Sequence, residues 1–307
     1  MAVICSLEQA HDQQLLVGAC CAFGVFDGVH QGHRFIIEQA CQEARDTGRL
    51  SIALTFDIDP DELFHADRLK KLMSNGQRIA SLSEQGLDAV VVLPFTKEFA
   101  AQAPDEFLDL TFQGGTPSSM HIGFDLRFGA RASGGLAELE EWGSVRGMSV
   151  HGHDLLEVDG QPVTSTRIRL LLAQGCIKEA NALLGSGYRV CGEVQQGRGE
   201  GGDFGFKTAN LHVPEMHKVL GDGVYAAYAY VDGKRYKAAV SNGVAPTFAD
   251  SAKANMEVHI LDFEGDIYGK SICVEFVEWL RPMMSFPSID ELISTVMGNI
   301  DWVRQNL

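Results

Sequence analysis

Short apolar segments alternate with helical patterns through the first 185 residues of the chain. Apolar, β-prone runs occur at residues 17–26, 50–56, 89–93, 120–124 and 148–155, and helical spacing of apolar residues occurs near residues 32–47, 77–85, 104–112 and 136–145. This alternation predicts a parallel sheet with helices on both faces, an α/β domain of the Rossmann-like, doubly wound kind. In such sheets ligands bind at the carboxyl ends of the strands.

The pattern changes after residues 185–187. Two more helical segments, 165–174 and 177–184, precede this point, and strand-like runs then follow one another at residues 188–196, 224–231, 234–242, 256–262 and 271–280. Strands joined by short turns predict a compact antiparallel barrel or sandwich. Residues 288–305 carry apolar side chains at helical spacing and predict a closing amphipathic helix. We therefore expect two domains, residues 1–186 and 187–307.

Length, composition and charge narrow the class of protein. A chain of 307 residues can form two cores, and 45% hydrophobic with 21% charged residues is typical of a globular protein. The formal charge of −16 argues against a partner that is nucleic acid, since backbone phosphates attract basic surfaces. The first residues contain no basic leader, and no apolar run approaches the ~20 residues of a membrane span. We expect a cytoplasmic protein without a membrane partner.

Seven cysteines are scattered along the chain, with no pair spaced as C-x-x-C. Buried thiols in a reducing compartment explain this distribution best.

The segment at residues 24–33 carries the first candidate chemistry. His30 and His33 lie where an apolar strand is followed by a helical pattern, so both are expected on the first turn of the helix. Unpaired backbone N–H groups and the helix dipole favour an anion there, and two imidazoles on one side can donate hydrogen bonds to phosphate oxygens. A surface or metal-ligating pair is the alternative. The flanking Gly24, Gly28 and Gly32 favour a phosphate-binding turn.

A second motif, residues 164–169, closes the first predicted domain. Ser165 or Thr166 can cap the following helix, and Arg167 and Arg169 can reach a polyphosphate. Together with the histidine turn, this motif supplies donors for the two sides of a nucleoside triphosphate, as attack at its α-phosphorus requires.

A glycine-rich loop at residues 197–210 enters a strand in the second domain. It is no P-loop, because Phe206 separates Gly205 from Lys207 and Thr208. Its backbone N–H groups can still wrap phosphates, and Thr208 and Asn210, two residues apart, point to one side as potential magnesium and phosphate ligands. An ordinary hairpin loop is the alternative. The glycines expected to contact phosphate are Gly197, Gly199 and Gly205.

These motifs resemble those of the bacterial bifunctional riboflavin kinase/FAD synthetases, over a span from about residue 18 to the C-terminus. The resemblance rests on residues 24–33 and 165–169, on 93–99 and 123–129 between them, and on 207–210, 223–225, 242–248 and 257–263 in the second domain. It implies a nucleotidyltransferase-type first domain and a riboflavin kinase-type barrel. It also adds to the nucleotide-binding set the residues Phe26, Asp27 and Asp125.

The resemblance implies flavin cofactor biosynthesis by two activities. The barrel phosphorylates riboflavin to FMN with ATP and Mg²⁺, with Thr208 and Asn210 as ligands. Glu257 matches the family's catalytic glutamate, and removal of a proton from the riboflavin hydroxyl requires such a base. The first domain transfers AMP from ATP to FMN and releases pyrophosphate, with His30, His33 and Arg167 stabilising charge. ATP, riboflavin and FMN are the expected small-molecule partners.

Two positions depart from the family pattern. Asp59 precedes Pro60 where the family has histidine, and an acid pointing inward there would repel phosphate. Lys207 replaces the proline of the kinase signature. These changes leave two alternatives: a member with one module impaired, or a flavin-binding regulator without turnover.

His151 and His153 share one face of a predicted strand, as a metal-ligand pair does. No third ligand is evident in the sequence.

Overall fold

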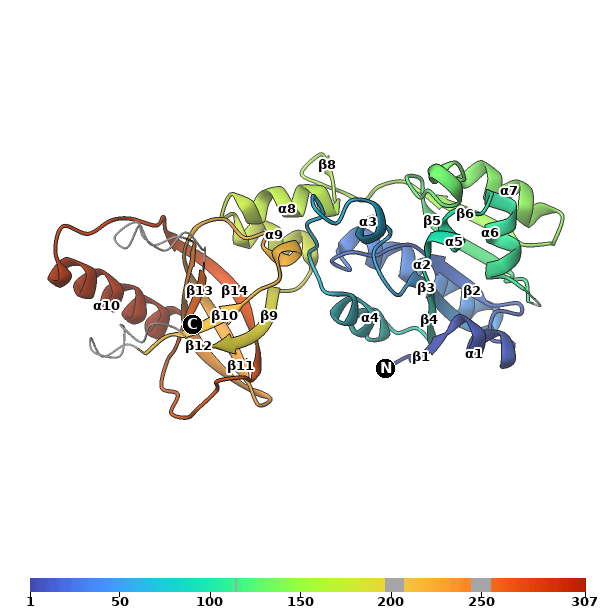
Figure 1. The fold of residues 1–307 in the computed structure, drawn as a ribbon. Coiled ribbons are helices and arrows are strands. Elements are labelled where there is room, and N and C mark those ends of the chain that lie inside the picture. Colours follow the sequence, from blue (N-terminus) through green and yellow to red (C-terminus); the bar gives the residue numbers. More distant parts are fainter. Residues whose placement is uncertain (114, 197–206, 244–254) are drawn as a thin grey trace. The chain divides into compact units, whose positions relative to one another are not determined.

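Two compact units divide the chain in the computed structural model, which describes residues 1–113, 115–196, 207–243 and 255–307 (Figure 1). The first unit comprises Met1–Leu69 and Met73–Ser165, and the second comprises Lys70–Leu72 and Thr166–Leu307. Among the described residues, no helix combines the length and the apolarity that a membrane span needs.

The first unit is built on a parallel sheet with the strand order β1-β4-β3-β2-β5-β6. Its strands are β1 (Val3–Ser6), β2 (Cys20–Phe23), β3 (Ser51–Phe56), β4 (Ala89–Leu93), β5 (Ser119–Gly123) and β6 (Ser149–His153). Its helices are α1 (Leu7–Asp12), α2 (Gln31–Thr47), α3 (Pro60–Phe64), α4 (Asn75–Ser83), α5 (Lys97–Ala100), α6 (Pro104–Thr111) and α7 (Leu136–Ser144). A hairpin of β7 (Glu157–Val158) and β8 (Gln161–Pro162) follows β6.

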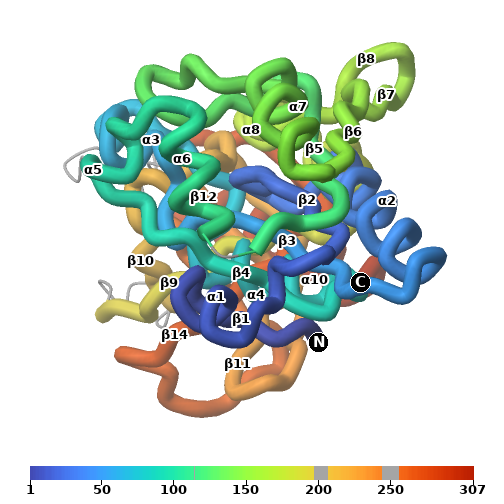
Figure 2. Tube along the Cα trace, turned by 90° about the vertical axis from the view of Figure 1, so that its right-hand side faces the viewer, coloured from blue at the N-terminus to red at the C-terminus, as the bar shows by residue number. Residues whose placement is uncertain are grey.

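Both faces of this sheet are covered, because alternate residues of each buried strand point to opposite sides. Ala22 of β2 and Ala53 of β3 pack with Ile37 of α2 and Leu82 of α4. Their strand neighbours face the other side and pack with α1, α6 and α7. Strand β1 adds an edge beside β4, with α1 next to it (Figure 2). The predicted doubly wound α/β domain is confirmed.

The second unit contains a closed antiparallel barrel of the described strands, in the order β10-β13-β12-β11-β14-β9. These strands are β9 (Tyr188–Gln195), β10 (Ala209–His212), β11 (Gly223–Val231), β12 (Lys234–Gly243), β13 (Asn255–Ile260) and β14 (Ser271–Arg281). Helix α10 (Ile289–Asn306) packs Ile300 and Val303 onto Ala226 and Ala239 of the barrel. The barrel alternative and the closing helix are thus confirmed.

Helix α9 (Ile177–Leu184) packs against β9 and β14. In helix α8 (Ser165–Ala173), which precedes it, the backbone oxygen of Leu172 accepts from the N–H of Gly221 at 3.0 Å. The Asn181 side chain donates to the carbonyl oxygen of Phe276 at 2.9 Å and accepts from the N–H of Tyr188 at 2.8 Å. The compact units therefore divide after Ser165. The predicted boundary of the functional modules at residue 186 stays a proposal.

Two of the seven cysteines are joined. Cys191 on β9 lies directly opposite Cys273 on β14, with Cα atoms 4.0 Å apart, and the two form a disulfide. Direct cross-strand neighbours are close enough for such a bond. The expectation of free thiols is wrong for this pair. Thiols remain at Cys5, Cys20, Cys21, Cys41 and Cys176.

Candidate active sites

The histidine turn follows β2 at the point where the strand order of the sheet reverses. The neighbours of β2 are β3 on one side and β5 on the other. Chain connections leave the sheet in opposite directions from this point, and in open α/β sheets ligands bind at such a reversal, outside the carboxyl ends of the strands. The sequence motif therefore lies where a doubly wound sheet binds its ligand.

The backbone of this turn adopts conformations that side chains disfavour. Phe26 and Val29 have φ values of 61° and 41°, and Gly28 has a φ of 85°. Positive φ values at bulky residues store strain, and such strain concentrates at ligand sites. Close packing explains why residue 32 is glycine, since a Cβ at this position would lie 3.2 Å from the Cε1 of His30.

His30 and His33 lie together as predicted. His30 is the N-cap of α2, and its Nδ1 accepts a hydrogen bond from the backbone N–H of His33 at 3.3 Å. The two rings stack with centroids 3.6 Å apart, and the edge of Phe26 packs against His33. Burial, with the neighbouring His30, lowers the pKa of His33 well below its ordinary value. His33 is therefore a neutral donor or acceptor at pH 7.

One ring nitrogen of His33 is left for a ligand. Its Nδ1 is buried without a hydrogen-bond partner among the described residues. Buried polar atoms are normally paired, so an unpaired one at a phosphate-type turn fits a site that is completed by its ligand. Helix α2 also has no acidic residue in its first turn, which keeps the anion-binding end of its dipole uncompensated.

Ser165 joins this turn through its side chain. Its hydroxyl donates to the backbone oxygen of Asp27 at 2.9 Å, while the carboxylate of Asp27 accepts from the N–H of Met73 at 3.2 Å. Thr166 and Arg167 follow on α8 but belong to the second compact unit. Their approach to the histidine turn stays a prediction.

Asp125 lies exposed in the turn that follows β5. Because β5 is parallel to β2 and pairs with it directly, this turn emerges at the same edge of the sheet as the histidine turn. Asp125 also lies near Gly123, where an added Cβ would come within 2.8 Å of its carboxylate. The topology thus supports its predicted place near the nucleotide.

Arg78 on α4 is a buried residue of this site that the sequence reasoning missed. Its side chain is fully buried and donates to the backbone oxygens of Val25 at 2.9 Å and Phe56 at 2.7 Å. A third bond reaches the hydroxyl of Thr55 at 2.5 Å. The guanidinium therefore fixes the carboxyl ends of β2 and β3 beside the histidine turn. Its helical position gave no signal, since arginine at that spacing is usually exposed.

Asp59 serves as a helix cap. Its carboxylate accepts from the N–H of Asp61 at 3.0 Å, and the side chain of Glu62 accepts from the N–H of Asp59 at 3.1 Å. Pro60 takes the first position of α3, where its missing N–H is tolerated. This capping box accounts for an aspartate before the proline.

In the barrel, Asn210 and Glu257 are direct cross-strand partners on β10 and β13. Their strand neighbours, including Leu211 and Val258, are buried inside the barrel, so Asn210 and Glu257 lie on its outer face. Side chains of opposite residues on antiparallel strands are within about 5.5 Å at Cβ. The structure thus brings together two of the residues that the sequence singled out.

Thr208 lies two residues before Asn210, partly exposed, immediately before β10. The next residue back, Lys207, is exposed, and its backbone oxygen accepts from the ring Nδ1 of His259 on β13 at 2.9 Å. This bond anchors the chain where the family's proline is replaced. Three predicted phosphate contacts, Gly197, Gly199 and Gly205, lie outside the described residues.

An open hollow of about 950 Å³ lies elsewhere in the first unit. It is lined by residues of β1 and α1 and by residues that follow β3 and β4, among them Asp57 and Pro94. None of the predicted site residues lines it.

Together the sites define a chain with a nucleotide-binding α/β module and a separate barrel module with its own polar cluster. Comparison with known families finds FAD synthetase at residues 12–167 and riboflavin kinase at residues 184–307. The chain belongs to the family of bifunctional riboflavin kinase/FMN adenylyltransferases.

Relatives with this name match along nearly the whole chain. The Haemophilus influenzae enzyme is 32% identical over 99% of this chain and 98% of its own. The Pseudomonas fluorescens enzyme is 30% identical over 94% and 92%. A solved Streptococcus pneumoniae structure, described as a macrolide-efflux protein, is 28% identical, with a TM-score of 0.82 over 94% of this chain and 95% of that chain.

Proposed function

We propose that the two modules carry out successive steps of flavin cofactor synthesis at separate sites. The barrel module converts riboflavin and ATP to FMN and ADP, and the α/β module converts FMN and ATP to FAD and pyrophosphate. The observation that carries this proposal is that each module holds its own cluster: the stacked His30 and His33 in one, and the paired Asn210 and Glu257 in the other.

In the barrel, Glu257 accepts the proton from the primary hydroxyl of riboflavin as that oxygen attacks the γ-phosphorus of ATP. Asn210 lies directly opposite Glu257 and can hold the γ-phosphate close to this base. Glycines of the loop at residues 197–205 bind the other phosphates through their N–H groups.

Mg²⁺ fits this cluster by the chemistry of its donors. The hydroxyl of Thr208 and the amide oxygen of Asn210 are oxygen ligands, which this cation prefers. When bound, Mg²⁺ neutralises charge on the transferred phosphate.

In the α/β module, a phosphate oxygen of FMN attacks the α-phosphorus of ATP, and the bond to pyrophosphate breaks. The FMN phosphate is already ionised at neutral pH, so this step needs orientation and charge stabilisation more than a base. His30 and His33 donate from the first turn of α2, and Arg167 supplies positive charge from α8. Gly24, Phe26, Asp27, Gly28, Gly32, Asp125, Ser165 and Thr166 shape the nucleotide pocket.

The alternatives of an impaired module or a regulator have less support. The carboxylate of Asp59 serves α3 as a cap, and the chain at Lys207 is held by His259. Both substitutions are thereby accommodated locally.

The test is to incubate the protein with ATP, Mg²⁺ and either riboflavin or FMN and to separate the flavins by chromatography. Both FMN and FAD should form from riboflavin. Formation of FAD from FMN alone would refute the kinase assignment, and formation of FMN alone would refute the adenylyltransferase assignment. Binding of flavin without turnover would identify a regulator.

Two substitutions separate the sites. Asn210→Ala should abolish FMN formation and leave FAD synthesis from supplied FMN within about twofold of wild type. His33→Ala should do the reverse, with FAD synthesis falling about 100-fold, as removal of a positioned donor does elsewhere. Equal loss of both activities in either variant would contradict separate sites.

A further inference from the structure

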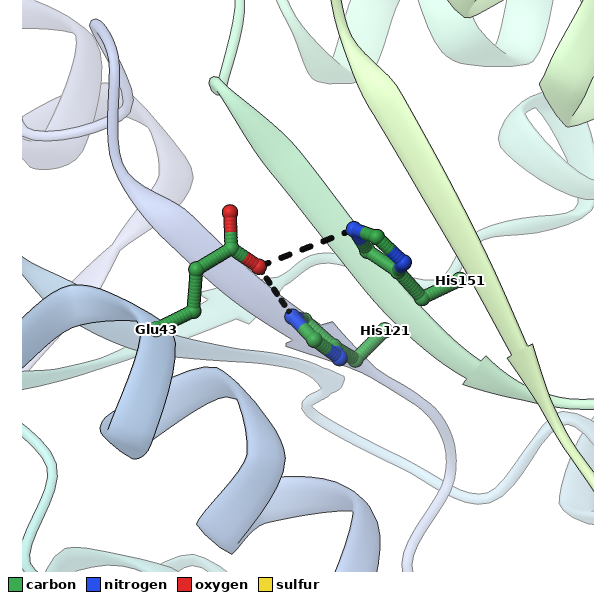
Figure 3. A group of neighbouring side chains, drawn as sticks. All are labelled: Glu43, His121 and His151. Carbon is green, nitrogen blue, oxygen red and sulfur yellow. Dashed lines mark hydrogen bonds and ion pairs between the residues drawn. The ribbon is translucent and has the colours of Figure 1, made fainter. Parts of the chain in front are cut away.

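A second cluster of histidines lies away from the proposed active sites. Glu43 on α2, His121 on β5 and His151 on β6 bring their ligand atoms within 4.8 Å of one another (Figure 3). His121 and His151 are register partners on adjacent parallel strands, and Glu43 reaches them from the helix that covers this face. The third ligand that the sequence did not reveal therefore comes from other elements.

Both imidazoles direct Nε2 toward the same carboxylate oxygen. Glu43 Oε2 lies 2.8 Å from Nε2 of His121 and 3.6 Å from Nε2 of His151. The longer distance is beyond a hydrogen bond. The ring of His151 also stacks on that of His121, with centroids 4.7 Å apart, so the two imidazoles present Nε2 side by side. Ligand atoms around tetrahedral Zn²⁺ are roughly 3.3 Å apart, given bonds of about 2.0 Å. Small side-chain rotations would bring these three atoms to that spacing.

His153 contacts the cluster through His121. Its Nε2 lies 2.9 Å from Nδ1 of His121, and its ring stacks on that of His121 with centroids 5.2 Å apart. A metal-bound histidine commonly donates its other ring N–H to an acceptor that fixes its tautomer, and Nε2 of His153 is placed to be that acceptor for His121. His151 and His153, the pair predicted from one face of the strand, therefore have different places. His151 faces Glu43 with the other ligand candidates, and His153 contacts His121.

The protonation states suit metal binding. Burial lowers the pKa values of His121 and His153, so both are neutral at pH 7. Burial is the largest single influence on Glu43 and raises its pKa, but hydrogen bonds from His121 and Ser119 together with the nearby imidazoles leave the pKa lowered overall. Metals bind neutral imidazole and ionised carboxylate.

The cluster is open to solvent and lies apart from the histidine turn. The side chain of His121 is 6% exposed, but those of Glu43 and His151 are 28% and 45% exposed, so an ion can enter. Glu43 follows His30, the N-cap, by 13 positions, all of them on α2, which at 1.5 Å per residue is roughly 20 Å along the helix. The cluster is therefore distinct from the phosphate turn.

We propose that Glu43, His121 and His151 bind one divalent transition-metal ion of the zinc type, with water as the fourth ligand. Two imidazoles and one carboxylate favour such a metal over Mg²⁺, which prefers oxygen ligands alone. The ion ties the last turns of α2 to β5 and β6 and so holds the helix whose first turn carries His30 and His33.

The test uses tag-free full-length protein, stripped with a chelator and titrated with Zn²⁺ in a calorimeter. One equivalent should bind and survive dialysis, and the melting temperature should rise by several degrees. Glu43→Gln and His151→Ala should weaken binding at least 100-fold, and His153→Ala about tenfold or more. His65→Gln, at an exposed histidine, is the matched control and should bind as wild type. Cobalt should give the visible absorption of a tetrahedral ion in wild type and in His65→Gln, and not in Glu43→Gln or His151→Ala.

Two results would overturn the proposal. Folded wild-type protein that binds no zinc would identify the cluster as a hydrogen-bonded pair alone. Unchanged binding in Glu43→Gln and His151→Ala would place the metal elsewhere, for example on a thiol. Circular dichroism checks the fold of each variant, and the half-exposed His151 offers a substitution that the fold tolerates if Glu43→Gln does not fold.

Discussion

A neutral imidazole is the form that the surroundings of His33 favour at pH 7. Burial excludes water from its ring, and the stacked His30 opposes a second positive charge. In the unfolded chain the same side chain titrates near pH 6.5. The folded state therefore gives up a proton-binding site that the unfolded state keeps.

This difference predicts how stability changes with pH. Below pH 6.5 the unfolded chain binds a proton at His33 that the folded protein does not, so the free energy of unfolding should fall as pH decreases from 7 to 5. One such group contributes at most about 1.4 kcal/mol per pH unit. Urea denaturation with EDTA should show a smaller slope for His33→Gln. An identical slope would mean that His33 is protonated in the folded state.

Arg78 gives a second prediction at this scale. Arg78→Met should lower the free energy of unfolding by about 3 kcal/mol or more, because buried carbonyl oxygens of Val25 and Phe56 lose their donors. Arg49→Met, at an exposed position, should change it by less than about 0.5 kcal/mol. Denaturation curves measure both. Equal effects of the two substitutions would refute a structural role for the buried guanidinium.

Single residues were predictable where the chemistry is local. His30 and His33 share one turn, so spacing alone places them together. The partnership of Asn210 and Glu257 needed the family resemblance, since 46 residues separate them and only the barrel register aligns them. Arg78 and the Glu43–His121–His151 cluster could not be predicted, because their contacts depend on tertiary packing between separate elements.

At the scale of elements, the most regular patterns were predicted best. The predicted ranges agree with β4 (Ala89–Leu93) and α9 (Ile177–Leu184), and the larger helices differ by one or two residues at their ends. Strand β1 was missed because it has only four residues and lies at the edge of the sheet. Its Val3 and Ile4 are exposed, so the segment lacks the alternation of apolar and polar residues that predicts a strand. Helices α3 and α5 are single turns, which are too short for periodicity.

The cap of α3 tests the interpretation of Asp59. Asp59→Ala should lower the free energy of unfolding by about 1 kcal/mol. Asp59→Asn should lower it much less, since asparagine also caps helices. If Asp59 instead faced the phosphate of FMN, both substitutions would lower the KM for FMN, and neither would affect stability. Thermal melts and FAD synthesis kinetics distinguish these cases.

At the scale of the whole molecule, α8 and α9 decide where the chain can be divided. Family similarity to riboflavin kinase begins at residue 184, yet the long segment of the compact unit that contains the barrel begins at Thr166. Leu183 and Leu184 of α9 are buried, and the helix packs on β9 and β14. The first boundary marks where sequence similarity to the family begins, and the second marks where the packed unit begins.

A chain starting at residue 166 should therefore be more stable than one starting at residue 187. Loss of α9 exposes apolar barrel surface, and each buried leucine contributes roughly 1.5–3 kcal/mol. Melting temperatures and riboflavin phosphorylation by the two chains test this. Equal stability would show that α8 and α9 add nothing to the barrel.

The capping of α2 by a histidine has a consequence for how this protein can change. Serine, aspartate or asparagine would cap the helix better, so a search for stabilising substitutions would select them at position 30. Each would also remove the second ring nitrogen that the proposed chemistry needs. At position 30, stability and activity therefore favour different residues. A screen for heat resistance alone would select a more stable but inactive enzyme.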